Sequence, residues 1–334
     1  MPKLRTICLT PVKNEAWILD RFLKCTSLWA DHIIIADQYS EDNSRAIAQN
    51  YPKVILVDNP STAYDEQARQ KLLLKTAREI RGPRLLVTLD ADEILTSNFF
   101  ENSEWKTVLN APKGTVIRFH WINIRPDFKT YWSPEGALPM GFVDDGSDHK
   151  GGLIHSPRIP LPDGSNTIVL KDIKCLHYQY TNWERMKSKQ RWYQVWERIN
   201  NAHRSSIEIY RQYHHMDAIR TEHIKPLIND WLSGYIEKGI DMTGVSSNDL
   251  FWYDREVLKS FDHHGTDKFR REAIWDVNWK HVANRLGKTM NASQYKDPRS
   301  TIQRYVHRWL KKTQGSSGKL SVRIIQRALR QLGW

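Results

Sequence analysis

The sequence predicts an α/β protein in which helices cover both faces of a mostly parallel sheet, followed by a helical, basic C-terminal extension. Strand-like and helix-like segments alternate through residues 1–95, as in parallel sheets with right-handed crossovers. Two strand segments, His32–Ala36 and Leu85–Leu89, are apolar except for His32 and Thr88, as expected for strands buried on both faces. The excess positive charge lies in residues 255–334, which hold 18 Lys and Arg against 6 Asp and Glu.

The alternating part contains four predicted strands and three predicted helices. The strands are expected at Thr6–Val12, His32–Ala36, Val54–Val57 and Leu85–Leu89. The helices are expected between them, at Ala16–Ala30, Asp42–Asn50 and Asp65–Ile80. Ligands of such sheets bind at the carboxyl ends of the strands, which is where Asp37 and Asp90 lie.

The middle of the chain has longer and less regular segments. Strands are expected at Val116–Ile124 and Thr167–Gln179. Between them, Arg125–Gly164 is predicted to be irregular, and loops of this length inside compact domains are usually functional. Trp183–Ile199 is predicted to be a helix with interleaved basic and aromatic residues, and most of the chain beyond Asn201 is predicted to be helical.

Composition narrows the class of protein. A mean hydropathy of -0.62 fits a globular protein, and no apolar run approaches the roughly 20 residues needed to cross a bilayer. The first residues lead straight into a predicted strand, so no secretory signal is expected. Three isolated cysteines, Cys8, Cys25 and Cys175, lie in apolar segments. They predict buried thiols in a reducing compartment, without disulfides or a zinc site.

The position of the first glycine excludes two nucleotide-binding classes. No glycine precedes Gly82, whereas dinucleotide-binding domains and P-loop proteins need a glycine-rich turn after their first strand. An aspartate-nucleophile phosphatase is also disfavoured, because its Asp-x-Asp normally ends the first strand and not the fourth. Any nucleotide bound at this sheet would therefore be held by side chains.

Three carboxylates follow the fourth predicted strand directly. Asp90, Asp92 and Glu93 come immediately after the apolar run Leu85–Leu89. Their charge must be met by solvent, by cationic side chains or by a metal. A hard divalent cation that also binds phosphate oxygens is the simplest partner, so the segment predicts an enzyme that handles a diphosphate.

Four stretches of the chain resemble glycosyltransferases of family 2, which have the GT-A fold, a Rossmann-like and mostly parallel sheet. Thr10–Glu15 is similar to the family's Pro-x-x-Asn-Glu turn, and Ile33–Asp42 to its second strand and Asp-x-x-Ser-x-Asp turn. Arg69 stands where the family often has a basic residue, and Asp90–Glu93 resembles the metal-binding Asp-x-Asp. Tyr39 departs from the family pattern, which usually has glycine there; Gln70 stands where Asn is common.

The resemblance implies a role for each donor-site residue. Asp37 would accept a hydrogen bond from the nucleotide base, and Pro11 and Glu15 would line the base and ribose site. Asp90 would hold the ribose or the sugar, and Arg69 would neutralise the diphosphate or hold the sugar. The predicted donor-binding set is Thr10, Pro11, Asn14, Glu15, Asp37, Arg69, Asp90 and Ala91.

The resemblance also implies a metal, Mn²⁺ or Mg²⁺, bound by Asp92. A single carboxylate is a poor metal site, so a second ligand is expected from further along the chain. His177 is the first candidate and His155 the second, because a neutral imidazole accepts Mn²⁺ readily.

Family 2 enzymes mostly invert the anomeric centre, which requires a general base for the acceptor hydroxyl. The base is expected in the segment after the Asp-x-Asp strand. Asp145 is the first candidate and Asp144 the second, with Glu135 and Asp148 as alternatives.

The resemblance thus implies a metal-dependent, inverting glycosyltransferase that moves a sugar from a nucleoside-diphosphate sugar to a hydroxyl acceptor. Cell-surface glycan or lipopolysaccharide assembly, in the cytoplasm or at the inner membrane face, is the expected setting. Residues 1–200 would form the GT-A domain, with the donor half in 1–95 and the acceptor half in 96–200. Residues 201–334 would form the basic helical region.

Three alternatives stay open from the sequence. The enzyme could glycosylate a modified DNA base, with the basic region holding nucleic acid. The chain could be a non-catalytic module that binds nucleotide-sugars or glycans, or a sugar nucleotidyltransferase, although the latter normally has a glycine-rich first loop.

The last predicted helix, Leu320–Leu332, is amphipathic. Arg323, Arg327 and Arg330 lie on one side, and the opposite side is apolar. This pattern is that of a helix lying in a membrane interface, but a helix docked on its own domain has the same pattern and is more common.

Overall fold

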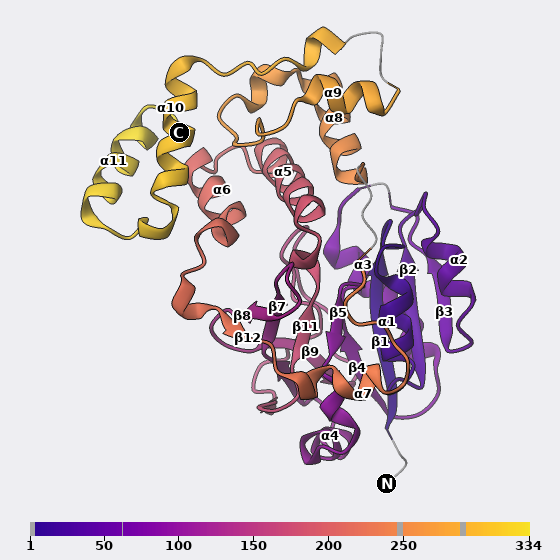
Figure 1. Ribbon diagram of the computed structural model, residues 1–334. Helices are drawn as coiled ribbons and strands as arrows, with labels where there is room; N and C mark the ends of the chain where they lie inside the picture. The colour runs from indigo at the N-terminus through magenta and orange to yellow at the C-terminus, as the bar shows by residue number, and fades with distance from the viewer. Residues whose placement is uncertain (1–3, 62, 246–249, 288–291) are drawn as a thin grey trace. The chain divides into compact units, whose positions relative to one another are not determined.

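The computed structural model describes residues 4–61, 63–245, 250–287 and 292–334 (Figure 1). The chain forms two compact units. Unit 1 comprises residues 1–181 and 225–247, and unit 2 comprises residues 182–224 and 248–334. The unit limit differs from the predicted domain limit after residue 200 because helix α5 (Trp183–Asn200) packs against α6 and α8 of unit 2. Compact units need not coincide with domains, so the domain limits stay a prediction.

A seven-stranded sheet forms the centre of unit 1. Four parallel strands, β4, β1, β2 and β3, lie side by side in that order. Strand β9 runs antiparallel to both of its neighbours, β4 and β6, while β10 pairs parallel with β6. The bounds are β1 (Arg5–Val12), β2 (His32–Asp37), β3 (Val54–Asp58), β4 (Arg84–Thr88), β6 (Val116–Phe119), β9 (Leu138–Val143) and β10 (Thr167–Val169).

Helices cover both faces of the sheet (Figure 1). Alternating side chains of the strands pack against them. Cys8, Ile33 and Ile35 share a core with Phe22 of α1 (Leu19–Thr26). The neighbouring residues of the same strands pack with α3 (Glu66–Glu79) on the other face. The helices of unit 1 are completed by α2 (Ser44–Gln49), α4 (Ser103–Leu109) and α7 (Ser233–Ile236). The predicted α/β class with helices on both faces is confirmed.

Unit 1 also contains a second sheet, which has five strands. Its first strand along the chain, β5, follows β4. The strand order is β12-β8-β7-β11-β5. Strand β11 pairs parallel with β7 and antiparallel with β5, so His177 lies beside both Asn123 and Glu93. The bounds are β5 (Glu93–Leu95), β7 (Trp121–Ile124), β8 (Thr130–Trp132), β11 (Cys175–His177) and β12 (Lys225–Pro226).

Three sequence predictions about the middle of the chain are wrong. The strand expected at Val116–Ile124 divides into β6 and β7, and the strand expected at Thr167–Gln179 divides into β10 and β11. In both cases the chain passes from one sheet to the other, which interrupts the hydrogen-bond ladder. The stretch expected to be irregular contains β8 and the central strand β9.

The sequence hid β9 because it contains Pro139 and Gly141, which are uncommon in strand interiors. The structure shows why a glycine is needed there. A Cβ at Gly141 would lie 2.9 Å from the Cβ of Ile117 on the neighbouring strand β6. The register between β6 and β9 shifts at this point, between Ile117 and Arg118.

The described part of unit 2 is helical. Ser188 Oγ of α5 donates a hydrogen bond to Asp254 at 2.7 Å, joining α5 to α8. The helices are α5 (Trp183–Asn200), α6 (Ser206–Tyr213), α8 (Trp252–His264), α9 (Trp279–Arg285), α10 (Thr301–Lys312) and α11 (Leu320–Gln331). Among all described residues, no helix is both long and apolar enough to span a membrane.

All three cysteines are buried and free, as the sequence predicted. Burial raises the pKa of the Cys8 thiol to about 12 and also raises the pKa values of Cys25 and Cys175. These thiols are therefore protonated and unreactive at neutral pH.

Candidate active site

The candidate site lies where β4 ends and its carboxylate segment begins. The turn after β4 is closed on itself. The Glu93 backbone N–H donates to the Asp90 carbonyl oxygen, and the Asp90 N–H donates to Glu93 Oε2, both at 2.9 Å. Because β1, β2 and β4 are parallel neighbours, this turn lies at the same sheet edge as the turns that follow β1 and β2. Ala91, a predicted donor contact, is buried within the turn.

Arg158 binds two of the three carboxylates. Its guanidinium donates to Asp90 Oδ2 at 3.1 Å and to Glu93 Oε2. Glu93 is fully buried, and its second oxygen, Oε1, has no hydrogen-bond partner among the described residues. Burial raises the pKa of Glu93 to about 7, against the opposing effect of Arg158. The guanidinium fixes the turn that carries Asp90 and Asp92.

Asp92 faces His177. Asp92 Oδ1 lies 3.9 Å from His177 Nε2, which is too long for a hydrogen bond, and both side chains are buried. The other ring nitrogen, Nδ1, lies 2.7 Å from Asn123 Oδ1. Because an amide oxygen only accepts, Nδ1 donates its proton to Asn123, and Nε2 is the ring nitrogen nearer Asp92.

This pair suits a divalent cation in its chemistry. A carboxylate oxygen and an imidazole nitrogen oriented by a second hydrogen bond are typical ligands of Mn²⁺. No cluster of three or more His, Cys, Asp or Glu side chains that could hold a metal occurs among the described residues. Asp92 and His177 would therefore need further oxygens from a bound ligand.

Aromatic rings surround the pair. The ring of Trp121 stacks on His177, with centroids 4.2 Å apart, and the Arg158 guanidinium lies over the Trp121 ring, 5.6 Å from its centroid. Tyr180 meets His177 edge-on at 5.7 Å, and Trp132 meets Tyr180 at 5.3 Å. These contacts fix the imidazole plane and offer aromatic surface beside the carboxylates.

Asp37 ends β2 at the same edge. Its Oδ2 accepts hydrogen bonds from Arg45 at 2.9 Å and from the Ser40 backbone at 3.2 Å. Its Oδ1 is buried and has no hydrogen-bond partner among the described residues. A buried carboxylate oxygen without a donor is costly, so it is suited to accept from a ligand N–H.

The turn after β1 contacts the turn that follows Asp37 and holds it in place. Asn14 has a left-handed backbone (φ 56°), and its Oδ1 accepts from the backbone of Glu41 at 2.7 Å. Glu15 Oε2 accepts from the Trp17 indole at 2.7 Å. Thr10 and Pro11 are buried in β1. Asn14 therefore connects the two turns, whereas Glu15 is half-buried beside them.

Two other predicted residues lie on neighbouring segments. Arg69, on α3, lies 3.9 Å from Glu66 and over the Tyr64 ring. Glu66 in turn accepts from the Ser156 backbone at 2.8 Å, which attaches the loop that carries His155 and Arg158 to the start of α3. His155 is exposed in this loop and has a left-handed backbone (φ 54°).

The structure does not bring the predicted bases to this edge. Because β9 is antiparallel to β4, with Leu85 opposite Val143, the segment after β9 lies at the amino end of β4. Asp144 is buried there and accepts from Arg78 at 2.9 Å and Arg84 at 3.1 Å. Burial opposes its ionisation, but these bonds hold the pKa of Asp144 below its usual range. Asp145 follows it on the surface.

The expected catalytic role of Asp144 and Asp145 thus conflicts with the strand register. Strand β9 places both residues at the end of the sheet opposite to Asp92. Because β9 was not predicted from the sequence, its direction was not predicted either. The sequence therefore could not show at which end of the sheet the residues after β9 lie. Glu135 and Asp148 are exposed loop residues and stay predictions.

Sequence reasoning missed Arg158, Asn123 and the burial of Glu93. Arg158 is a single arginine in a loop, 65 positions from the glutamate that it contacts, and no local pattern marks it. Asn123 carried one usable signal. It is a polar residue inside the apolar run Trp121–Ile124, where a buried amide needs a partner.

The comparisons with known proteins agree with this arrangement. The sequence model of the family described as Glycosyl transferase family 2 matches residues 8–103. This range runs from β1 through the turn that carries Asp90 and Asp92. It therefore includes the predicted donor-site residues, whereas His177 and Arg158 lie beyond it.

Two solved structures illustrate the structural likeness. One is glucosyl-3-phosphoglycerate synthase from Mycobacterium tuberculosis in complex with Mn²⁺, UDP and glucosyl-3-phosphoglycerate, with 16% identity, 35% of this chain and 44% of that chain covered, and a TM-score of 0.27. The other is mannose-1-phosphate geranyltransferase from Thermus thermophilus, with 18% identity, coverage of 43% and 51%, and a TM-score of 0.26.

The chain spans less than half of the length of the mycobacterial synthase. Superpositions this partial carry no argument about substrate. The family assignment rests on the sequence match, which fits the parallel sheet and the carboxylate turn described above. Residues 8–103 thus match glycosyl transferase family 2, and the α/β fold with its mostly parallel sheet agrees with the GT-A class.

Proposed function

We propose that unit 1 is the catalytic part of a metal-dependent glycosyltransferase that uses a nucleoside-diphosphate sugar and inverts the anomeric centre. The observation that carries the proposal is the pair Asp92 and His177, 3.9 Å apart at the edge of the sheet that also carries Asp37 and Asp90. The family match supports transfer chemistry. The nucleoside-diphosphate sugar, the metal and the inversion of the anomeric centre are proposals that go beyond this match.

Asp37 would read the nucleotide base. Its buried Oδ1 accepts no hydrogen bond from the described residues, and Arg45 holds the other oxygen in place. A base N–H that reached Oδ1 would satisfy it. Asn14 keeps the adjoining turn in register, so its role in this proposal is to position Asp37.

Asp92 and His177 would hold Mn²⁺ or Mg²⁺ together with the donor's phosphate oxygens. When bound, the ion would stabilise the charge that develops on the leaving diphosphate. Asp90, fixed by Arg158, would orient the ribose or sugar, and the rings of Trp121, Tyr180 and Trp132 would offer a surface for a sugar ring.

The acceptor would be a hydroxyl group of a glycan or glycolipid, and cell-surface glycan assembly at the cytoplasmic membrane face is the proposed setting. A nucleic-acid acceptor stays an alternative that no contact in the described residues favours.

The test is a thermal-shift panel of UDP, GDP, CDP and dTDP, with and without Mn²⁺. A ligand that binds only the folded protein stabilises it by about 2.7 kcal/mol at one hundred times its Kd. We expect a Mn²⁺-dependent shift with one base that is lost in Asp92→Asn and in His177→Gln. Asp145→Asn, an exposed acid at the other end of the sheet, is the control and should retain the shift.

Failure would be informative in two ways. No shift with any nucleotide from folded protein would overturn the donor site. A shift without donor hydrolysis or sugar transfer, in the presence of Mn²⁺, would instead favour a non-catalytic module that binds nucleotide-sugars.

A further inference from the structure

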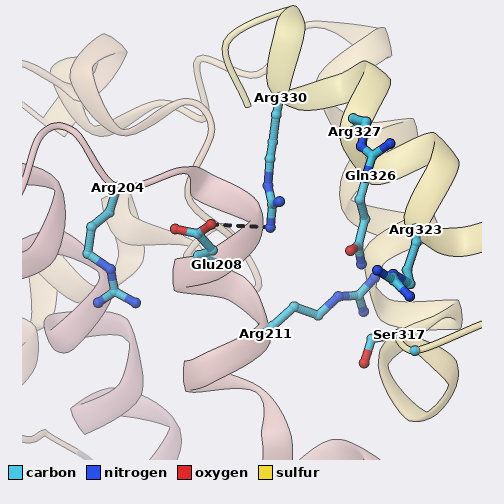
Figure 2. Close-up of a pocket in the computed structure, with 9 residues that line it drawn as sticks. Arg204, Glu208, Arg211, Ser317, Arg323, Gln326, Arg327 and Arg330 are labelled. Atoms are coloured by element: carbon cyan, nitrogen blue, oxygen red, sulfur yellow. Dashed lines mark ion pairs between the residues drawn. The ribbon is translucent and has the colours of Figure 1, made fainter.

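Unit 2 contains a pocket of about 520 Å³ that is lined mainly by arginines (Figure 2). The residues come mainly from two segments far apart in the sequence, helix α6 with the turn before it and helix α11. Figure 2 shows Arg211 reaching from α6 toward α11, whose residues Arg323, Gln326 and Arg327 lie opposite it. The lining is completed by Arg204, Glu208, Arg330, Ser317 and Gly318.

Carboxylates neutralise two of these arginines. Arg204 pairs with Glu197 at 2.5 Å, and Arg330 pairs with Glu208 at 3.2 Å. Both pairs leave the arginines fixed at the walls of the pocket. The net charge of the pocket therefore depends on the other three.

Arg211, Arg323 and Arg327 keep their positive charge uncompensated in the described structure. Arg211 donates to neutral groups, which are the Leu310 carbonyl at 2.8 Å, Gln314 at 2.9 Å and Thr313 at 2.7 Å. Arg323 and Arg327 are exposed, and neither forms an ion pair with a described carboxylate. Burial lowers the pKa of Arg211, which shows that its charge is poorly solvated there.

The C-terminal segment that supplies Arg323 and Arg327 contains no acid of its own. Residues 298–334 hold nine Lys and Arg and no Asp or Glu. Three uncompensated guanidinium groups around one cavity favour an anion with several oxygens, such as a phosphate group.

Helix α11 carries a second, independent feature. It docks on unit 2 through Val322 and Gln326, and Trp334 packs beyond its end with Leu310 and Ile207. Its broad apolar side faces solvent instead. Four large side chains there are 44% to 72% exposed, namely Leu320, Ile324, Ile325 and Leu332. Several large apolar side chains exposed on one side of a single helix are typical of an interaction surface.

We propose that α11 and the arginine pocket form a docking site for an anionic lipid bilayer. The pocket would receive the phosphate of a lipid headgroup, and the exposed apolar residues of α11 would enter the acyl boundary beside it. The combination of an apolar face with flanking arginines is that of a helix lying in the plane of a membrane interface. The proposal does not depend on the sugar-transfer activity of unit 1.

The exposed apolar side of α11 favours a bilayer over other phosphate sources. Free phosphate or a nucleotide would use the arginines but gives no reason for Leu320 and Ile324 to face water. Nucleic acid would use the charge of residues 298–334 but likewise leaves the apolar side without a partner. A bilayer with anionic headgroups uses both features at once.

The test is co-sedimentation of the full-length protein with two kinds of vesicle. One kind contains phosphatidylcholine alone and the other phosphatidylcholine mixed with phosphatidylglycerol. The charge variant is the double substitution Arg323→Gln/Arg327→Gln, and its matched control is Arg270→Gln/Lys280→Gln, two exposed cations of unit 2 outside the pocket. The apolar variant is Ile324→Ser, matched by Ile236→Ser, which is similarly exposed in unit 1.

We expect binding to the phosphatidylglycerol vesicles that weakens with salt. Loss of each pocket arginine should reduce the partition coefficient about fivefold. Ile324→Ser should reduce it about tenfold through lost apolar burial. Both controls should partition within about twofold of wild type.

Several results would overturn the proposal. They are equal binding to both vesicle types, equal losses in variant and control, or no sedimentation at all. A thermal shift with inorganic phosphate, or retention of a duplex oligonucleotide, in the absence of vesicle binding would assign the pocket to a soluble anion or to nucleic acid instead. All variants should first show the far-UV spectrum and melting transition of the wild type, since the substituted side chains are exposed.

Discussion

The two ends of the seven-stranded sheet treat buried carboxylates in opposite ways. At the amino end of β4, Asp144 accepts hydrogen bonds from Arg78 and Arg84 and forms a complete ion-pair cluster. At the carboxyl end, Asp90 and Glu93 share Arg158, while Asp92 faces His177 across 3.9 Å. In the first arrangement Asp144 is held by two arginines, whereas in the second Glu93 Oε1 has no hydrogen-bond partner among the described residues, and this is the end of the sheet proposed above to bind a ligand.

The backbone shows the same contrast. Left-handed turns at the amino end are taken by glycines, Gly82, Gly114 and Gly146. At the carboxyl end, Asn14 and Tyr39 adopt left-handed backbones instead, with φ of 56° and 50°. A bulky residue such as Tyr39 is strained there by about 1 kcal/mol or more, whereas asparagine adopts the left-handed region more readily. Strain at the carboxyl end is consistent with a site that positions side chains at some cost in stability.

The largest expected effect is on activity at the carboxyl end. Asp92→Asn should lower sugar-transfer or donor-hydrolysis rates about a thousandfold, because loss of metal assistance costs several kcal/mol of transition-state stabilisation. Its melting temperature without ligand should stay close to that of wild type. Initial rates with the nucleotide-sugar found in the thermal-shift panel measure the effect, and an unchanged rate would remove Asp92 from the mechanism.

The matching change at the amino end should affect stability instead. Asp144→Asn leaves Arg78 and Arg84 without their shared carboxylate. Breaking a fully buried ion pair costs roughly 3–5 kcal/mol of unfolding free energy. Because both arginines are partly exposed, we expect a loss at the low end of this range, about 3 kcal/mol. Urea denaturation measures this loss. Because the pKa of Asp144 is lowered in the folded state, its contribution is present above the unfolded pKa and is lost as pH falls through the folded value.

The rate constant per folded molecule should be unchanged in Asp144→Asn. A rate that falls while the stability does not would show that Asp144 acts in catalysis and not in stability. Asp144 would then return as a candidate base.

Glu93 gives the carboxyl end a distinct pH dependence. Folding raises the pKa of Glu93 from 4.5 to about 7, so the folded protein binds the proton more tightly than the unfolded chain. The stabilisation from the protonated carboxyl is complete below about pH 4.5 and is lost as pH rises toward about 7, by an amount on the order of 3 kcal/mol. Glu93→Gln should flatten this part of the stability curve.

Denaturation of wild type and Glu93→Gln at several pH values would measure the difference. Parallel curves between pH 4.5 and about 7 would show that Arg158 keeps Glu93 ionised throughout this range.

The smallest expected effect concerns Tyr39. Its side chain is 55% exposed, so removal loses little packing, while glycine relieves the left-handed strain. Tyr39→Gly should therefore stabilise the protein by about 1 kcal/mol in thermal denaturation. Tyr39→Ala removes the ring but keeps the Cβ and serves as the control. Equal stability of the two variants would show that the backbone there is not strained.

The sequence predicted the first four strands and three helices well because their signals are local. The apolar run of β2 and the helical spacing of Phe22 and Leu23 directly reflect burial on a sheet and on one helix face. The prediction from the sequence failed for β9, because Pro139 and Gly141 weaken the strand pattern. The contact that requires Gly141 is with Ile117, which lies on another strand, 24 positions earlier in the chain.

By itself, then, the sequence determined the alternating α/β class, the family motifs through residue 103 and the basic, acid-free C-terminal segment. These are properties of residue order and composition. Only the tertiary structure decided that Arg158 binds Asp90, that His177 faces Asp92, and that Asp144 lies at the opposite end of the sheet. Those outcomes depend on strand direction and register, which are set by contacts between residues far apart in the chain.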